Sequence, residues 1–469
     1  MFFKLYLFIL IAGLVLSCSN ESTTEPTVNV PPTCEITQPS NNGSFSLGDT
    51  VEISVNASDP DGQIENVKFY IEGQLKNTDY ERPYSYTWDT SEGQHGVHII
   101  RAEAVDDEGG IGASSEVSIT VTQSGSTLEE QLQDILDSCI VEFGVMGASV
   151  SIIFSDRNMI KLASGYSEPN VPIESDMIFG MASITKTYTA TLILLLKEEG
   201  LLSLNDSLNK WLPPYQNIDS TITIKQLLNH TTGLYDFTNN PAFWDAIKAD
   251  SLNKKWTPEE VLNTMVLEPI FPVGTDYSYS NTNYILLGLI IESVTGNTVL
   301  QEFKSRLLNP FNIHNTFLLA EEEITGFLVN SYSQFDMNGC RKYQQVFADM
   351  VWTCGGLYST AEDIALFGIE LFQGNILQSS TLNEMCDLGT SGYGYGVHLI
   401  EDINELVFAY GHDGGGLGFV SRLAYIPEID AVFVLMANEI TNDNSHGNYL
   451  TIITHDMLEL LLDQTLVRY

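Results

Sequence analysis

Residues 179–196, FGMASITKTYTATLILLL, place a serine and a lysine three positions apart where a polar segment turns into a long apolar run. The apolar run predicts a buried helix, and residues i and i+3 lie on the same face of a helix. We therefore expect Ser183 Oγ and Lys186 Nζ to meet. A serine hydroxyl becomes a nucleophile when a neighbouring base takes its proton, and burial of Lys186 would lower its pKa enough for that task.

The S-x-x-K spacing is weak evidence by itself, because SLNK occurs twice more in the chain, at 207–210 and 251–254. Those two copies lie in polar stretches with no apolar helix behind them, so we expect both on a solvated surface. The copy at Ser183 differs because a helix begins there. A helix N-terminus favours negative charge, and the Ser183 backbone N–H can contribute to an oxyanion hole.

Two further segments accompany Ser183 in the chain: YSYSNTNY at 277–284 and AYGHDGGGLGF at 409–419. Together, in this order, the three segments resemble those of the serine β-lactamase and penicillin-binding DD-peptidase superfamily, in particular its class C-like branch. The resemblance covers about residues 127–465. It extends to TIKQLLNHTTGL at 223–234 and CGGLYSTAEDIALF at 354–367.

The resemblance implies a role for each motif residue. Ser183 would be the acylated nucleophile, Lys186 its partner, and Tyr279 the residue that relays protons to and from the serine and the leaving group. The implied substrate-binding residues are Asn281, which hydrogen-bonds the substrate amide, and His412, Gly414 and Gly415 on the strand that lines the cleft, with Gly415 N–H as second oxyanion donor. No metal and no cofactor is expected.

Each of these residues also has a structural interpretation. Tyr279 could be a core residue, and Asn281 could cap the helix that follows it. His230, in LLNHTTGL, falls where a helix end meets a turn, and we expect it to be structural. The segment GHDGGGLGF could be a flexible turn, although glycine also permits close approach of backbone to substrate.

The sequence departs from the family at the last motif. Most β-lactamases carry Lys-Thr-Gly there, and the cation and hydroxyl hold the substrate carboxylate, whereas this chain has His412 and Asp413. Asp413 would repel a carboxylate if it faced the cleft, and would not if strand alternation turned it away. We expect an inefficient β-lactamase. We see no glutamate placed as a deacylation base, so Tyr279 with Lys186 would have to activate water.

The N-terminus predicts export. Residues 1–17 have one early lysine and a short apolar run, as a signal peptide does, and LVLSC resembles the lipobox of bacterial lipoproteins, which implies lipidation of Cys18. Ser19, in place of aspartate, points by the same resemblance to the outer membrane. The alternative is an ordinary cleaved signal with an incidental cysteine. Residues 18–33 are polar and contain proline, so we expect an extended tether.

Residues 34–122 are predicted to form an immunoglobulin-like β-sandwich. Apolar residues alternate in VEISVNA (51–57), VKFYI (67–71) and VSITV (117–121), and turn clusters separate these runs. The pattern, with ASDPDG at 57–62, resembles bacterial Ig-like modules. Asp59, Asp61, Asp106 and Asp107 are interpreted as turn formers, with a calcium site as the alternative.

After a short linker at 123–126, residues 127–469 alternate helical and strand patterns. Strands are expected near both ends of this region and helices between them. This order predicts an antiparallel sheet flanked by helices, an α/β (α+β) arrangement, with a separate helical lobe, and the family resemblance implies that the fold is β-lactamase-like. The protein is thus expected to be multidomain: an all-β module followed by a serine hydrolase domain.

Composition limits the partners. The 469 residues include 61 acidic and 20 basic ones, a net charge of −41, which makes nucleic acid an improbable partner. We expect a monomer that acts on a small ester or peptide, D-Ala-type peptides included, and meets the membrane through its lipid. An esterase without peptidase activity and an inactive surface-binding protein are the alternatives. A disulfide between Cys340 and Cys354 is open to test.

Overall fold

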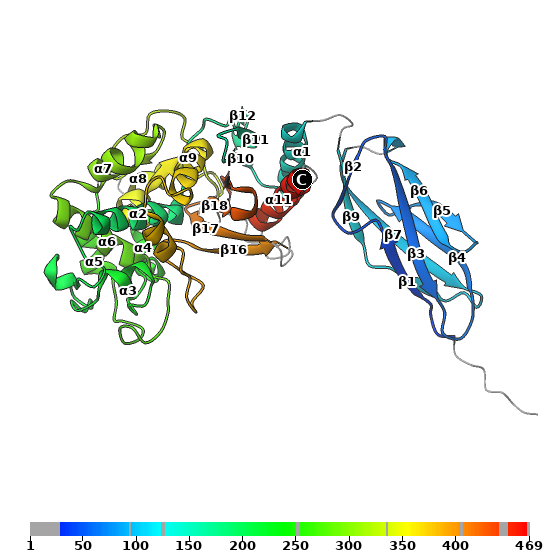
Figure 1. Ribbon diagram of the computed structural model, residues 1–469, viewed down its shortest axis with the longest axis horizontal. Helices are drawn as coiled ribbons and strands as arrows, with labels where there is room; N and C mark the ends of the chain where they lie inside the picture. Colours follow the sequence, from blue (N-terminus) through cyan, green and yellow to red (C-terminus); the bar gives the residue numbers. More distant parts are fainter. Residues whose placement is uncertain are drawn as a thin grey trace, which may run out of the picture. The chain divides into compact units, whose positions relative to one another are not determined.

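The computed structural model describes residues 29–92, 95–122, 127–249, 254–333, 336–403, 407–439 and 449–466. The predicted signal peptide, Cys18 and the linker at 123–126 lie outside the described residues, as does most of the tether. The chain divides into two compact units, an N-terminal one of strands and a larger one of strands and helices (Figure 1). Each is described by itself.

The N-terminal strands form the two sheets of the predicted Ig-like module. One sheet has the order β1 (Thr33–Gln38), β3 (Thr50–Ser58), β6 (Tyr84–Asp89). The other runs β2 (Gly43–Ser46), β9 (Val117–Thr122), β7 (Gly96–Asp106), β4 (Ile64–Ile71), β5 (Gln74–Asp79), and β8 (Ile111–Ala113) also pairs with β7. The alternation read from the sequence places Val51, Ile53, Phe69 and Ile119 in the core with no exposed surface.

The aspartates of this module hold its turns. Asp106 accepts hydrogen bonds from the backbone N–H of Glu108 and of Gly110, and Asp107 accepts one from Gln63 N. In the part of the chain that the structure describes, no group of three or more His, Cys, Asp or Glu side chains has the arrangement of a metal site. The aspartate contacts are those that turn-forming residues make.

The larger unit contains a seven-stranded antiparallel sheet. Its order is β12 (Val171–Pro172), β11 (Met159–Glu168), β10 (Gly147–Phe154), β19 (Ala431–Ala437), β18 (Phe419–Ile426), β17 (Val407–Gly416), β16 (His398–Ile403). Because β10 pairs with β19, strands from both ends of the region join, as the sequence predicted.

Helices cover both faces of this sheet, which is why all seven residues of β19 are buried. Its side chains alternate between the two cores: Phe433 and Leu435 pack with α1 (Leu128–Phe143) and α11 (Tyr449–Leu466), whereas Val432 and Val434 pack on the side of α9 (Ala361–Phe372). Helix α1 begins with a capping box in which Thr127 and Glu130 satisfy each other's backbone N–H.

The helical lobe lies between the two strand groups in sequence. It is built on α2 (Thr185–Glu198), α6 (Asn281–Thr295) and α8 (Gln344–Gly355), which contact one another. The shorter helices are α3 (Ile224–Leu228), α4 (Pro241–Lys248), α5 (Pro258–Met265), α7 (Val299–Glu302) and α10 (Ser379–Met385), and a small sheet has the order β13 (Phe179–Gly180), β15 (Leu357–Ser359), β14 (Phe317–Leu318).

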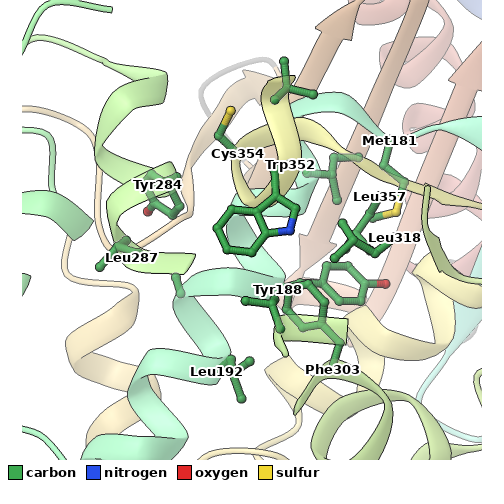
Figure 2. Close-up of a cluster of buried hydrophobic side chains, with 14 of the residues drawn as sticks. Met181, Tyr188, Leu192, Tyr284, Leu287, Phe303, Leu318, Trp352, Cys354 and Leu357 are labelled. Atoms are coloured by element: carbon green, nitrogen blue, oxygen red, sulfur yellow. The ribbon is translucent and has the colours of Figure 1, made fainter. Parts of the chain in front are cut away.

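Helix α2 is buried along most of its length. Figure 2 shows its side chains Tyr188 and Leu192 among residues of the neighbouring elements, with Trp352 of α8 close by. Tyr188 stacks on Phe367 of α9 at 3.6 Å between ring centroids. Because the first turns of α2 are buried on all sides, the side chain of Lys186 is not exposed to solvent.

No single helix of the described residues is long and apolar enough to cross a membrane. The bent pair Asn281–Thr295 and Val299–Phe311 passes that test by length and composition, but most of α6 is buried inside the helical lobe. The disulfide considered between Cys340 and Cys354 is absent from the structure, where both are buried free thiols.

Candidate active site

Ser183 lies in a tight 3-10 turn, Ala182–Ile184, directly before α2 rather than inside the helix. The turn is held at Met181, whose N–H donates to Leu357 O at 2.9 Å and whose carbonyl accepts the Ser421 hydroxyl at 2.7 Å. Ala182 has φ 47°, a left-handed conformation that non-glycine residues adopt at a cost of about 1–3 kcal/mol. The strained turn presents Ser183 at the junction of lobe and sheet.

Lys186 is fully buried, and its Nζ contacts three oxygens: Ser183 Oγ at 3.1 Å, Asn281 Oδ1 at 2.7 Å and the Cys354 carbonyl at 2.7 Å. Burial lowers the pKa of Lys186 from 10.5 to about 8, against the opposing charge of Asp236. A neutral amine has two N–H bonds and one lone pair. The Asn281 and Cys354 oxygens can only accept, so they hold the N–H bonds and leave the lone pair for Ser183.

Tyr279 approaches the same hydroxyl, with its OH 2.9 Å from Ser183 Oγ. Burial raises the pKa of this phenol well above its usual 10, so it keeps its proton at neutral pH. The His230 ring packs against Tyr279 at 4.4 Å, and its Nδ1 accepts a hydrogen bond from Ser280 N. His230 thus supports the Tyr279 segment, a structural role of the kind expected.

Asn281 is the first residue of α6, after Ser280 in the N-cap position, so the interpretation of Asn281 as a helix cap is wrong. Its side-chain N–H group faces Asp236 at 2.9 Å and Thr238 Oγ1 at 3.3 Å. A carboxylate only accepts hydrogen bonds, so this contact turns the Asn281 oxygen toward Lys186. Asp236 was not predicted from the sequence. Its place just after LLNHTTGL is the one sequence feature that could have indicated it.

Strand β17 borders the site from the sheet. Gly414 lies so close to the nucleophile turn that a Cβ there would be 2.3 Å from Met181 O and 3.2 Å from Ser183 N. His412 is on the same face and 3% exposed. Asp413 faces the other way, where both carboxylate oxygens pair with Arg422 at 2.8 Å. The open question about Asp413 is thereby answered: it points away from the site.

The SLNK copy at 207–210 lacks these surroundings. Lys210 pairs with Asp206 at 2.7 Å and its side chain is 51% exposed, as expected for a solvated surface. Ser251 lies outside the described residues. The structure therefore brings Ser183, Lys186, Tyr279 and Asn281 together, with His412, Gly414 and Gly415 on the adjoining strand, and leaves the copy at 207–210 apart.

Comparison with known proteins agrees with this geometry. The family model described as Beta-lactamase matches residues 128–453. The chain belongs to the beta-lactamase family. A second model, Bacterial Ig domain, matches residues 32–102. The family resemblance and the Ig-like module predicted from the sequence are thus confirmed.

Relatives of this beta-lactamase family member include penicillin-binding proteins. Penicillin-binding protein 4* of Bacillus subtilis is 25% identical over 299 residues, 59% of this chain and 64% of that protein, so less than two thirds of it is spanned. Penicillin-binding protein 4 of Amycolatopsis lactamdurans is 28% identical over 334 residues, 65% of this chain and 84% of the relative.

Two similar solved structures are, by their names, an amidohydrolase and an amidase. A D-stereospecific amidohydrolase from Streptomyces sp. is 28% identical with a TM-score of 0.58, over 66% of this chain and 93% of that chain. D-amino acid amidase from Ochrobactrum anthropi SV3, complexed with L-phenylalanine amide, is 26% identical with a TM-score of 0.62, over 72% and 100%.

The family site opens into a pocket of about 430 Å³, part of it open to solvent. Ser183, Asn281 and Gly415 line it together with an apolar wall that contains Phe243, Trp244, Phe347 and Val351. Phe347 comes so close to Gly416 that a Cβ there would be 2.8 Å from its ring. Among the described lining residues none is a lysine or an arginine. The pocket is therefore shaped for an apolar group beside Ser183.

Proposed function

We propose that this protein is a serine hydrolase that acts through an acyl-enzyme on an ester or a peptide, D-Ala-type peptides included. The observation that carries the proposal is the shared contact at Ser183, whose Oγ lies 3.1 Å from Lys186 Nζ and 2.9 Å from Tyr279 OH. A hydroxyl between a buried amine of pKa about 8 and a protonated phenol has both a base and an acid at hand.

In the first step neutral Lys186 takes the Ser183 proton as Oγ attacks the substrate carbonyl carbon. The carbonyl oxygen gains the negative charge, and the backbone N–H groups of Ser183 and Gly415 are the donors proposed to stabilise it. The bond to the leaving group then breaks. The leaving nitrogen or oxygen receives a proton from Tyr279 OH, and the lysine proton restores the phenol. The acyl group stays on Ser183.

In the second step water replaces the leaving group. Lys186 accepts a proton from the water through the Tyr279 hydroxyl, which passes its own proton to the amine as it takes the one from water. The water oxygen attacks the acyl carbon, and the ester bond to Ser183 breaks as Oγ receives the proton back. Lys186 can serve in both steps, because a pKa of about 8 lies close to neutral pH. The proposal needs neither a metal nor a dedicated glutamate.

The similar proteins support an acyl-transfer activity without choosing its substrate. Their names include penicillin-binding proteins and a D-amino acid amidase. An inactive surface-binding protein fits less well, because such a protein has no need to keep a buried lysine against the hydroxyl of Ser183.

The test is covalent labelling. Purified protein is treated with a serine-reactive fluorophosphonate, digested and analysed by mass spectrometry. We expect one adduct, on Ser183, that is lost after heat denaturation before labelling. Folded protein that carries no adduct on Ser183 would contradict the proposal. Comparison of acyl nitrophenyl esters with D-Ala-D-Ala peptides then separates an esterase from a peptidase.

We also propose that the protein is exported and anchored through lipidated Cys18, as an outer-membrane lipoprotein that meets its substrate at the cell envelope. The LVLSC segment and the apolar run before it support this. Cells grown with an alkyne fatty acid should label the wild type and leave Cys18→Ala unlabelled. Equal labelling of both would exclude the anchor.

A further inference from the structure

His412 is the one side chain of strand β17 near Ser183 that could carry a positive charge toward the site. Its Nδ1 lies 2.5 Å from the carbonyl oxygen of Asp413. A carbonyl only accepts, so Nδ1 carries the hydrogen. Nε2 lies 3.0 Å from the hydroxyl of Tyr393, which donates to it. Both ring nitrogens are thus occupied, and neither can donate to a substrate.

The surroundings keep this histidine neutral. His412 is 3% exposed and Tyr393 is 5% exposed, so the pair has little access to water. Burial lowers the pKa of His412 well below 6.5. The His398 ring, 5.0 Å away, accepts the Asp413 N–H at its own Nε2 and presents no N–H to His412 there.

The other cations that the structure describes near the site are also engaged. Lys186 contacts three oxygens, and Arg422 is bound to Asp413 on the opposite face of the sheet. The described residues that line the pocket include neither lysine nor arginine. A free carboxylate placed beside Ser183 would therefore lose part of its water without gaining a cationic partner among the described residues, which is costly, whereas an amide or ester would not.

We propose that this enzyme acts on substrates whose leaving group carries no free carboxylate, and that Tyr393 sets this preference by occupying Nε2 of His412. The inference rests on the proposed serine hydrolase function and specifies its substrates: amides and esters with an uncharged leaving group in place of peptides with a free C-terminal carboxylate. Tyr393 acts as a specificity-determining residue through His412, without contact to the reacting atoms.

The experiment uses two thioesters that differ in one group. Acetyl-D-alanyl-thioglycolic acid and its primary amide share the acyl group and the sulfur leaving atom, and only the acid carries a carboxylate. We expect the wild type to favour the amide in kcat/KM by at least about tenfold. Tyr393→Phe frees Nε2 of His412 and should reduce this preference at least about threefold, through KM for the acid.

The matched control is Tyr395→Phe, which removes a hydroxyl near Glu384 that does not contact His412. Its preference should equal that of the wild type. Nitrogen-15 NMR of the imidazoles gives a second readout: with the acid bound, His412 of Tyr393→Phe should take a second proton, on Nε2, whereas the wild-type ring should keep hydrogen on Nδ1 alone. If the wild type turns over the acid as well as or better than the amide, the inference is overturned and the proposed function is not. Failure of both thioesters to acylate Ser183 overturns it together with the proposed function.

Discussion

The side-chain oxygen of Asn281 lies 2.7 Å from Nζ of Lys186. Asp236 fixes the orientation of the Asn281 amide, because its carboxylate accepts a hydrogen bond from the amide nitrogen. A reversed amide would place N–H bonds against the lysine and take away one of the acceptors that direct its lone pair. The base at Ser183 is therefore maintained by a chain of three side chains, from Asp236 through Asn281 to Lys186.

Replacement of Ser183 by alanine should abolish turnover, by at least about a thousandfold in kcat, because no other hydroxyl contacts both Lys186 and Tyr279 among the described residues. The matched control is Ser207→Ala, in the exposed SLNK copy, which should keep wild-type activity. Both are measured by ester hydrolysis and fluorophosphonate labelling. Residual labelling of Ser183→Ala at the wild-type rate would place the nucleophile elsewhere.

The pH dependence of kcat/KM should report Lys186. The lysine must be neutral to accept the proton, and its pKa is lowered to about 8, so activity should rise with pH through about 8 and fall about tenfold per pH unit below that. Tyr279 should not change the pH profile near neutral pH, because its pKa lies well above 10 and the phenol stays protonated there. A profile that is flat from pH 6 to 9 would be inconsistent with a lysine base.

Asp236→Asn should move that profile. The carboxylate favours the charged lysine, so its loss lowers the pKa of Lys186 further and shifts the rise in activity to lower pH. Looser orientation of Asn281 should also reduce kcat by about ten- to a hundredfold. Asp206→Asn changes the same charge at an ion pair of the surface SLNK copy and should leave the profile in place. If both variants keep the wild-type profile, Asp236 has no influence on the base.

The sequence predicted the parts of this site that depend on local geometry. The Ser183 and Lys186 contact follows from a three-residue spacing and a buried helix, and the strand pairing follows from apolar alternation at the two ends of the region. Asp236 and Tyr393 were missed because each reaches its partner from a loop, and tertiary packing alone brings those loops to Asn281 and to β17. The turn at Ser183 was also missed, since the apolar run gave no sign that the helix begins two residues later.

Gly414→Ala tests how closely β17 approaches the nucleophile turn. An added Cβ would lie 2.2 Å from Ser421 Oγ and 2.3 Å from Met181 O, so the turn or the strand must shift. We expect a loss of about 1–3 kcal/mol in the free energy of unfolding. Displacement of Met181 also moves Ser183, and fluorophosphonate labelling should slow at least about tenfold.

Gly415→Ala is the control for stability. Its added Cβ would meet no atom within 4 Å, so this variant should change the unfolding free energy by less than about 0.5 kcal/mol. Equal stability of the two variants in chemical denaturation would show that the strand yields without strain, and that the glycine at 414 is not required by packing.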